Sequence, residues 1–438
     1  MRIVMKILFI SLMSIAALSV YGCGGDDPEI VPGGNDGVET PGGETPDPGE
    51  TPEYEVGKVL PVWSEGYLDI HFISSARGEC AFYILPDGTT LLVDAGETDY
   101  KEGTSAPAKP DAMTRPYLVD GYYIKHFLPA GHSSIDWCAP SHFHVDHIGH
   151  KVNATETSPE GYRISGLTGV YGMVPFNRIL DRGYPDYKDD PDLPTLEGAF
   201  INDWVTFVKW AVGTKGVEAD RFRAGEEQIT LLYDKERYPE FRIFNICANG
   251  YVWNLDAAGK GHLVNGKATT PNAASCGFHL TYGKFDYIAC GDLTSSPQNR
   301  MAYYYRDFIP KGGLEAFKAN HHLSANSWGS QMQKCEFAPR VVICQSFSDY
   351  QPDVPLLTSI VNGTFENHSF TWDKDIFCCS AHPKAIAANA ALYENVAGRE
   401  GHVVVRVSPG GDDFYVYMLD DNNFDYKIKS IHGPYQCK

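Results

Sequence analysis

The sequence predicts an α/β fold, because two strand-rich stretches flank a segment with a helical pattern. Residues 67–73 alternate apolar and polar side chains, and two apolar runs, 80–85 and 91–93, lie on either side of the Asp-Gly pair at 87–88. Such alternation and such turns are typical of antiparallel strands. Four later segments are also expected to be strands: 278–282, 285–290, 340–344 and 403–407.

The middle of the chain, about 151–270, has fewer strand signals and is interpreted as a helical insertion. Five apolar residues recur there at the spacing of one helix face: Ile201, Trp204, Val205, Val208 and Val212. This spacing predicts an amphipathic helix over about 197–213. No second linker interrupts the chain, so residues 55–438 are expected to form one domain that contains this insertion.

Residues 1–22 have the pattern of an export signal. Arg2 and Lys6 precede an apolar run, 7–20, which is shorter than the roughly 20 residues that span a bilayer. The sequence Val20-Tyr21-Gly22-Cys23 resembles a relaxed lipobox, and the Gly-Gly-Asp-Asp that follows resembles the surface-export signal of Bacteroidota lipoproteins. This resemblance implies a lipid anchor on Cys23 in the outer membrane, with the cell surface as a possible final location. The alternative is ordinary cleavage, with Cys23 free or removed.

Residues 23–54 are interpreted as an acidic tether. Between 24 and 53 the chain has eight Gly, six Pro and nine Asp or Glu, and no Lys or Arg. Such a segment has too little apolar surface to form a core and stays extended. The whole chain has a net charge of −20, and −13 of it lies beyond the tether. This surplus of acid disfavours binding to long nucleic acid, which requires Lys and Arg to neutralise phosphates.

The segment Ser141-His142-Phe143-His144-Val145-Asp146-His147 places three imidazoles and a carboxylate within six residues. His142 and His144 are two apart, so they project to one side of an extended backbone. Imidazole and carboxylate groups are ligands suited to Zn²⁺ and neighbouring metals. The pattern therefore predicts a site for one or two metal ions, with zinc favoured and manganese as an alternative.

This HxHxDH pattern resembles the metallo-β-lactamase superfamily. Three further segments resemble the hydrolase domain of ComEC-type competence proteins in particular: residues 68–96 with their Pro-Asp-Gly turn, residues 272–292 with Asn272, Ser275 and Gly291-Asp292, and residues 318–324, Lys-Ala-Asn-His-His-Leu-Ser. The similarity covers about 65–150 and 270–385. It implies an αββα sandwich, in which two packed mixed β-sheets are flanked by helices and the metal site lies at one edge.

The resemblance implies six metal ligands from three motifs: His142, His144, Asp146, His147, Asp292 and His322. The first two would hold one ion, the next two would hold another, and Asp292 would bridge them. Either His321 or His322 would complete the second site, and His322 is the favoured ligand. His321 would then face the substrate, where it would stabilise charge or protonate a leaving group, and Asp146 would help to hold the attacking water. Asp94 is expected to orient a ligand histidine rather than to bind metal.

The chain also departs from the family pattern. Many members have a further histidine ligand for the first metal before the Gly-Asp motif, whereas Asn272 or Ser275 matches that position here. The first site is therefore expected to be weaker, more open or empty. Tyr350-Gln351-Pro352 replaces a Tyr-Gly-His-Pro segment, so a substrate-side histidine is missing, and Leu323 replaces the glycine of a His-His-Gly-Ser motif.

These features predict a metal-dependent hydrolase that acts on a phosphodiester, such as a small nucleotide or a head group. One alternative is a hydrolase of a carboxylic ester, a lactone or a β-lactam, because the same site serves such substrates. Another is a non-catalytic surface-binding lipoprotein with a degenerate metal site. The ten cysteines beyond Cys23 form no CxxC pair and most lie in apolar runs, so mostly free, buried thiols are expected.

Overall fold

The computed structural model describes residues 54–149, 156–188, 201–266, 268–328, 337–365, 368–369 and 372–438. All of them belong to one unit of the chain, residues 43–438. The predicted signal segment, Cys23 and the tether up to residue 53 lie outside the described residues. Within the described part, no helix is both long enough and apolar enough to cross a bilayer.

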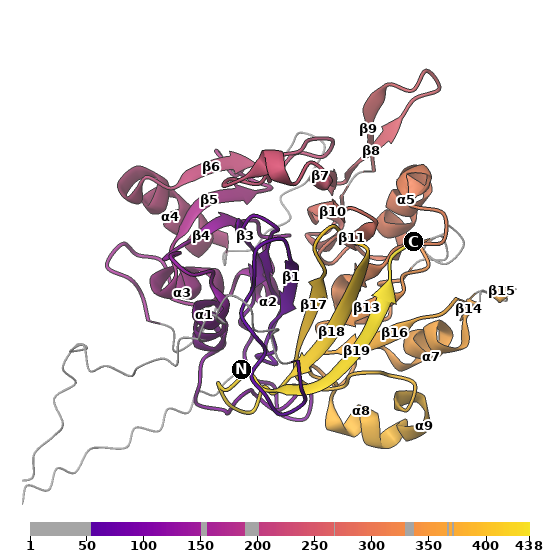
Figure 1. Cartoon of the computed structure of the whole chain (residues 1–438). Coiled ribbons are helices and arrows are strands. Elements are labelled where there is room, and N and C mark those ends of the chain that lie inside the picture. The colour runs from indigo at the N-terminus through magenta and orange to yellow at the C-terminus, as the bar shows by residue number, and fades with distance from the viewer. Residues whose placement is uncertain are drawn as a thin grey trace, which may run out of the picture. The chain divides into compact units, whose positions relative to one another are not determined.

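Nine strands form the first sheet, in the order β19-β18-β17-β1-β2-β3-β4-β5-β6 (Figure 1). The pairs from β19 to β3 are antiparallel, and those from β3 to β6 are parallel. Their bounds are β1 Leu68–Phe72, β2 Cys80–Ile84, β3 Thr90–Ala95, β4 Ile135–Cys138, β5 Phe176–Asp181, β6 Glu218–Arg221, β17 His402–Val407, β18 Asp413–Leu419 and β19 Ile428–Gln436.

Eight strands form the second sheet, in the order β16-β13-β12-β11-β10-β7-β8-β9. Here β11, β12, β13 and β16 are parallel, and the other pairs are antiparallel. Their bounds are β7 Phe241–Ala248, β8 Tyr251–Leu255, β9 Gly261–Asn265, β10 Gly277–Tyr282, β11 Phe285–Ala289, β12 Ala316–Lys318, β13 Val341–Cys344 and β16 Asp375–Cys378. A separate two-stranded pair consists of β14 Thr364–Phe365 and β15 His368–Ser369.

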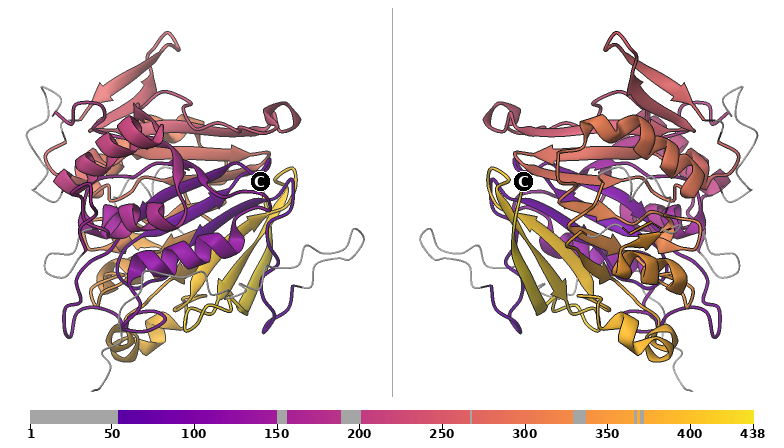
Figure 2. Two further views of the ribbon diagram at one scale, coloured as in Figure 1. Left: turned by 90° about the vertical axis from the view of Figure 1, so that its left-hand side faces the viewer. Right: turned by 90° about the vertical axis from the view of Figure 1, so that its right-hand side faces the viewer.

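Helices cover the outer faces of both sheets, and Figure 2 shows the two covered faces in turn. On the first sheet lie α1 Pro116–Phe127, α3 Gly166–Met173 and α4 Ile201–Trp210, which is extended by a π-helix, Ala211–Lys215. On the second sheet lie α5 Ser295–Tyr305, α7 Val354–Asn362, α8 Pro383–Ala388 and α9 Ala390–Tyr393. The shorter helical segments are α2 Val145–Ile148, Lys235–Arg237, Asn272–Ala274, Arg306–Phe308 and Asn320–Leu323.

The central strands are buried on both faces, which explains their nearly continuous apolar sequences. In β2, Ala81 and Tyr83 face the core between the sheets, whereas Phe82 and Ile84 face the core under the helices. A strand that is covered on both sides needs apolar side chains at successive positions rather than at alternate ones. One apolar layer therefore lies between the two sheets, and one lies between each sheet and its helices. The predicted αββα sandwich is confirmed.

The interval 151–270 contributes more strands than its sequence pattern suggested. It supplies β5 and β6 to the first sheet and β7, β8 and β9 to the second, in addition to α3 and α4. The turn between β7 and β8 is formed by Asn249 and Gly250, with φ angles of 53° and 81°. Such a pair of positive angles suits an Asn-Gly hairpin turn, so the chain carried a strand signal at this point. The predicted helix corresponds to α4.

Polar and thiol side chains are also found in the cores. All nine cysteines among the described residues are free, and eight of them are buried. Under α1, His71 contacts the Tyr123 hydroxyl at 2.9 Å, and the Ser74 backbone N–H donates to His402 Nδ1 at 2.9 Å. These histidines are parts of the packed interior, as expected from their lack of ligand spacing.

Buried His402 should make the fold sensitive to acid. Burial, together with neighbouring His71, lowers the pKa of His402 to about 3. In the unfolded chain the pKa is about 6.5. The unfolded state therefore binds the extra proton as the pH falls below 6.5, so stability is complete above that pH and is lost below it. From pH 7.5 to 5.0 the loss should be about 2 kcal/mol. Urea unfolding of wild type and His402→Asn at these two pH values, in the presence of chelator, measures this loss. The variant should lose less stability than wild type, and equal losses would contradict the prediction.

Candidate metal centre

Four strands, two from each sheet, end at the same edge of the sandwich and carry the motif residues. Asp94 lies near the end of β3, and the HxHxDH segment follows β4 and enters the short helix α2. Asp292 follows β11, and His321 and His322 follow β12. Because parallel strands in such sheets end at a common edge, residues far apart in the sequence meet there.

Two glycines allow the loops to approach closely enough for this meeting. A Cβ atom on Gly96 would lie 1.9 Å from the Asp146 carbonyl oxygen, so only glycine lets β3 pass beneath α2. Gly291 has a φ of 51°, and a Cβ there would lie 2.7 Å from Ser141 Oγ. A side chain at Gly96 would displace α2, and one at Gly291 would push the loop that carries Asp292 away from Ser141.

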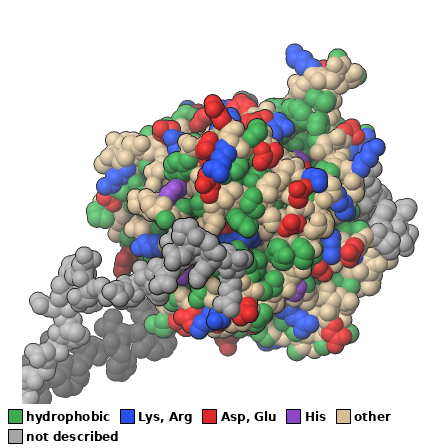
Figure 3. Space-filling view, in the orientation of Figure 1, with side chains coloured by type: hydrophobic (Ala, Val, Ile, Leu, Met, Phe, Trp, Pro, Cys, Tyr) green, Lys and Arg blue, Asp and Glu red, His purple; other side chains and the backbone are tan. Residues whose placement is uncertain are grey.

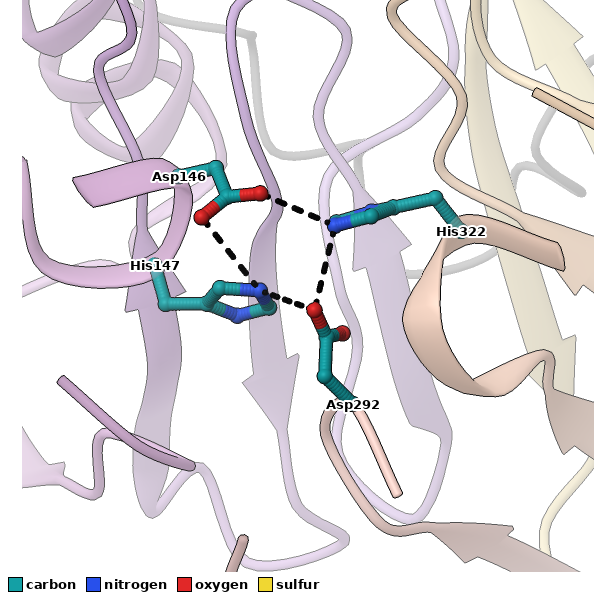
Figure 4. A group of neighbouring side chains, drawn as sticks. All are labelled: Asp146, His147, Asp292 and His322. Atoms are coloured by element: carbon teal, nitrogen blue, oxygen red, sulfur yellow. Dashed lines mark hydrogen bonds and ion pairs between the residues drawn. The ribbon is translucent and has the colours of Figure 1, made fainter. Parts of the chain in front are cut away.

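Asp146, His147, Asp292 and His322 point toward one another (Figure 4). His147 Nε2 lies 3.1 Å from Asp292 Oδ2 and 4.0 Å from Asp146 Oδ1. His322 Nε2 lies 3.1 Å from Asp146 Oδ2 and 3.3 Å from Asp292 Oδ2. One donor atom from each residue lies within 4.8 Å of all the others, a separation that a single metal ion could bridge.

Asp94 holds the HxHxDH segment in place. Its Oδ2 accepts from His147 Nδ1 at 2.9 Å and from the Ser141 hydroxyl at 2.7 Å, and its Oδ1 accepts from the Ser141 backbone N–H at 2.7 Å. The carboxylate thereby fixes a proton on His147 Nδ1 and leaves Nε2 directed at the cluster. This arrangement agrees with the orienting role expected of Asp94.

The cluster concentrates opposite charges in a buried place. Burial alone would lower the pKa of His147, but the carboxylates of Asp292, Asp94 and Asp146 outweigh it and raise that pKa well above its ordinary value. Burial likewise opposes the effect of Asp292 and Glu79 on His322, whose pKa is also raised. Burial would raise the pKa of Asp292, yet nearby His147 and His322 hold it well below the usual range. The carboxylates are thus strongly stabilised as anions that could receive a cation.

His142 and His144 lie next to the four-residue cluster. The ring of His142 lies 4.1 Å from that of His147 and 4.7 Å from that of His144, measured between ring centres. His142 Nε2 is 3.9 Å from Asp292 Oδ2. Burial and then His147 hold the pKa of His142 well below its ordinary value, so the neutral imidazole is favoured at this position.

The two adjacent histidines face different surroundings. The side chain of His322 is 1% exposed and belongs to the cluster, whereas that of His321 is 23% exposed. His321 Nδ1 lies 2.8 Å from Asn326 Oδ1, and its Nε2 lies 3.9 Å from Asp292 Oδ2. His321, His322 and Leu323 all have φ between 49° and 57°. Left-handed backbone at three successive residues other than glycine is strained, which is characteristic of functional sites.

The two residues that match the missing family histidine have different neighbours. The Asn272 side-chain amide lies 3.3 Å from His321 Nε2. Ser275 Oγ accepts a hydrogen bond from the Asp292 backbone N–H at 3.2 Å. Asn272 therefore lies beside the exposed histidine, while Ser275 supports the loop that carries Asp292. His279 is directed elsewhere, because its Nε2 pairs with Asp286 at 2.6 Å.

Two charged residues at the centre were not identified from the sequence. Glu79 Oε1 lies 2.9 Å from His322 Nδ1, and its other oxygen pairs with Lys318. Glu79 is one of many acids in the chain and Lys318 precedes the His-His pair by three positions. The sequence pointed to these two residues only through their positions in segments that resemble the family, 68–96 and 318–324.

The residues present fit a divalent metal ion. His142 Nε2 and Asp292 Oδ1 are buried and have no hydrogen-bond partner. Buried polar atoms without partners are costly, and a bound cation would satisfy both. Imidazole nitrogens and carboxylate oxygens are the donors of catalytic zinc sites. The donor set does not distinguish Zn²⁺ from Mn²⁺.

No family model and no curated protein matches the chain. Among solved structures, a mutant of CmlA β-hydroxylase aligns with 78% of this chain and 54% of its own, at 12% identity and a TM-score of 0.37. A protein from Parabacteroides distasonis, provisionally described as a metal-dependent hydrolase, aligns with 72% of this chain and 93% of its own, at 11% identity and a TM-score of 0.32. The match thus spans about half of the β-hydroxylase, and neither protein is similar enough to transfer its activity to this chain.

Proposed function

We propose that this protein is a metal-dependent hydrolase of the metallo-β-lactamase type, related to the ComEC-type hydrolase domain. The observation that supports this most is the convergence of Asp146, His147, Asp292 and His322, four potential ligands from both sheets, on one buried point. His142 and His144 would extend the site to a second ion that shares Asp292. Zinc is the favoured metal, with manganese as the alternative.

A metal ion held here would lower the pKa of a water molecule from about 15.7 toward about 7, which makes hydroxide available at neutral pH. Asp146 is suited to orient that water, because its side chain is 19% exposed while the other three ligands are almost fully buried. Its carboxylate can accept a hydrogen bond on the solvent side of the cluster. His321 is exposed to a similar degree and can donate a proton to a leaving group from the same side.

A small phosphodiester is the proposed substrate. On the face drawn in Figure 3, basic side chains are interspersed with acidic ones and do not gather into one basic patch. The net charge of −13 beyond the tether points the same way, against long polyanions. A small phosphodiester is not excluded by this charge, because a bound metal ion dominates the local field. The resemblance to ComEC-type proteins favours phosphodiesters over esters, lactones and β-lactams.

A paired assay tests the proposal. The purified full-length chain in mild detergent should hydrolyse bis-p-nitrophenyl phosphate, lose this activity in chelator, and recover it with Zn²⁺ or Mn²⁺. It should not hydrolyse nitrocefin; the reverse preference would favour the ester and lactam alternative. The double variant His144→Ala/Asp146→Ala is the control, and activity that survives both substitutions would refute the site. Absence of both activity and metal would favour a non-catalytic binding protein.

Export and lipid anchoring complete the proposal. Cys23, after the apolar segment 7–20, would carry the lipid, and the acidic tether would separate the domain from the outer membrane. Radiolabelled palmitate should be incorporated into wild type and not into Cys23→Ala. Labelling of both proteins, or of neither, would contradict an anchor at this residue.

A further inference from the structure

Glu79 and Lys318 form a buried ion pair between the two sheets, beneath the proposed metal ligands. Glu79 immediately precedes β2 of the first sheet, and Lys318 is the last residue of β12 in the second sheet. Both are almost completely buried, with exposures of 2% and 4%. The pair therefore joins the half of the site that carries HxHxDH to the half that carries Asp292 and His322.

Each member of the pair contacts a different ligand segment. Glu79 Oε1 forms an ion pair with His322 Nδ1 at 2.9 Å, and the same nitrogen lies 3.2 Å from the Gln345 carbonyl oxygen. Both acceptors lie on the Nδ1 side of the ring, so Nε2 is directed at the cluster. Lys318 Nζ donates to the carbonyl oxygen of Gly291 at 3.0 Å, and Gly291 immediately precedes Asp292. The two ligands of the second sheet, His322 and Asp292, are thus held by Glu79 and Lys318. Glu79 belongs to the first sheet, so the pair links these ligands to the other half of the site.

A second group of side chains also has the spacing of a metal site, and the position of Lys318 accounts for its charge. Glu79, Asp94 and His147 have donor atoms within 4.8 Å of one another, as a metal site would. However, Lys318 already pairs with Glu79, and the Nδ1 proton of His147 already serves Asp94. We therefore assign the positive charge in this group to Lys318 and not to another metal ion.

Stability alone does not account for this pair. Removing two charges from water costs about as much as their attraction returns, so apolar residues of similar volume are often equally stable in such places. The ion pair differs from apolar side chains in that it can hold neighbouring groups in one defined orientation. Partners of this kind, one contact away from a metal, typically change its affinity 10- to 100-fold.

We propose that Glu79 and Lys318 are positioning residues that set the alignment of the two halves of the metal centre. Glu79 orients His322, and Lys318 anchors the backbone that carries Asp292. This inference rests on the proposed metal site, but it concerns residues that do not bind the metal. It predicts that the pair can be replaced without loss of the fold and with loss of metal affinity.

The test uses the double variant Glu79→Met/Lys318→Met in the full-length chain. Zn²⁺ affinity is measured by competition with a chromophoric chelator, and the visible spectrum of the Co²⁺-loaded protein reports ligand geometry. The expected result is a melting temperature near that of wild type, an affinity about 10- to 100-fold weaker and a changed Co²⁺ spectrum. The matched control is Asp69→Asn/Arg406→Met, which removes another buried pair, bonded at 2.6 and 2.8 Å. The other side-chain contacts of this pair are with Tyr54, Tyr67 and His71. The control should leave Zn²⁺ affinity unchanged.

The outcomes separate this inference from the proposed function. Wild type that binds no Zn²⁺ or Mn²⁺ would refute the metal site itself. Wild type that binds metal, with a folded double variant of equal affinity and unchanged Co²⁺ spectrum, would refute only the positioning role. If the double variant does not fold, Glu79→Asp takes its place, because it retains both charges and draws the carboxylate back from His322. Weaker Zn²⁺ binding by Glu79→Asp supports the inference, and wild-type affinity overturns it.

Discussion

Asp292→Asn is expected to abolish metal binding and hydrolysis while leaving the fold intact. The Asp292 carboxylate is 1% exposed and lies within 3.9 Å of imidazole nitrogens from His142, His147, His321 and His322. Asparagine has nearly the same shape, and the backbone hydrogen bond to Ser275 does not require the carboxylate. Loss of the shared anion should weaken metal binding by more than the roughly 100-fold typical of outer partners. Elemental analysis and the phosphodiester assay measure both effects.

The matched control for this substitution is Asp286→Asn. Asp286 is also a buried aspartate, in β11, and it pairs with His279 at 2.6 Å away from the ligand cluster. This variant should lose some stability and retain its metal. If Asp292→Asn keeps a full complement of metal, or if both variants lose it equally, Asp292 does not bridge the centre.

His321→Ala and His322→Ala should fail in different ways. His322 is buried among Asp146, Asp292 and Glu79, so its loss should release metal and activity together. His321 lies on the exposed side, held by Asn272 and Asn326, so its loss should leave the metal in place. Removing a general acid typically costs about 10²- to 10⁴-fold in rate, and this loss should appear in kcat.

Metal content and steady-state kinetics of the two variants distinguish these roles. A substrate with a better leaving group needs less protonation, so it should reduce the defect of His321→Ala and leave that of His322→Ala unchanged. If His321→Ala loses metal while His322→Ala retains it, the two roles are exchanged. Equal metal loss in both would show that neither residue acts solely on the substrate.

The sequence predicted the strands and the helix whose apolar side chains are buried in a regular pattern. Strands β1, β2, β3, β10 and β11 have alternating or continuous apolar residues because they face one or two cores, and all were expected. The helical spacing of residues 201–212 likewise corresponds to α4 and its π-helical extension. In contrast, β6 is a short edge strand, Glu-Ala-Asp-Arg, whose side chains are exposed or half-buried, and β5 contains the polar pair Asn177-Arg178. Neither strand therefore has a clear apolar pattern.

The candidate site was predictable where its residues are adjacent in sequence. The HxHxDH segment is informative because metal-ligand residue types are concentrated in it, and the Gly-Asp and His-His pairs gained meaning from the family resemblance. Glu79 and Lys318 had no such local signal, because their roles depend on contacts between the two sheets. Which of His321 and His322 is buried also depends on the left-handed turn, which a sequence without glycine there did not indicate.

The central claim is that Asp146, His147, Asp292 and His322 bind one metal ion. Crystals of the full-length protein grown without chelator, with diffraction data collected above and below the zinc and manganese absorption edges, test this claim most directly. The account predicts an anomalous peak between His147 Nε2, His322 Nε2 and the carboxylates of Asp146 and Asp292. No peak there in metal-supplemented crystals, with the four side chains still bonded directly to one another, would contradict it.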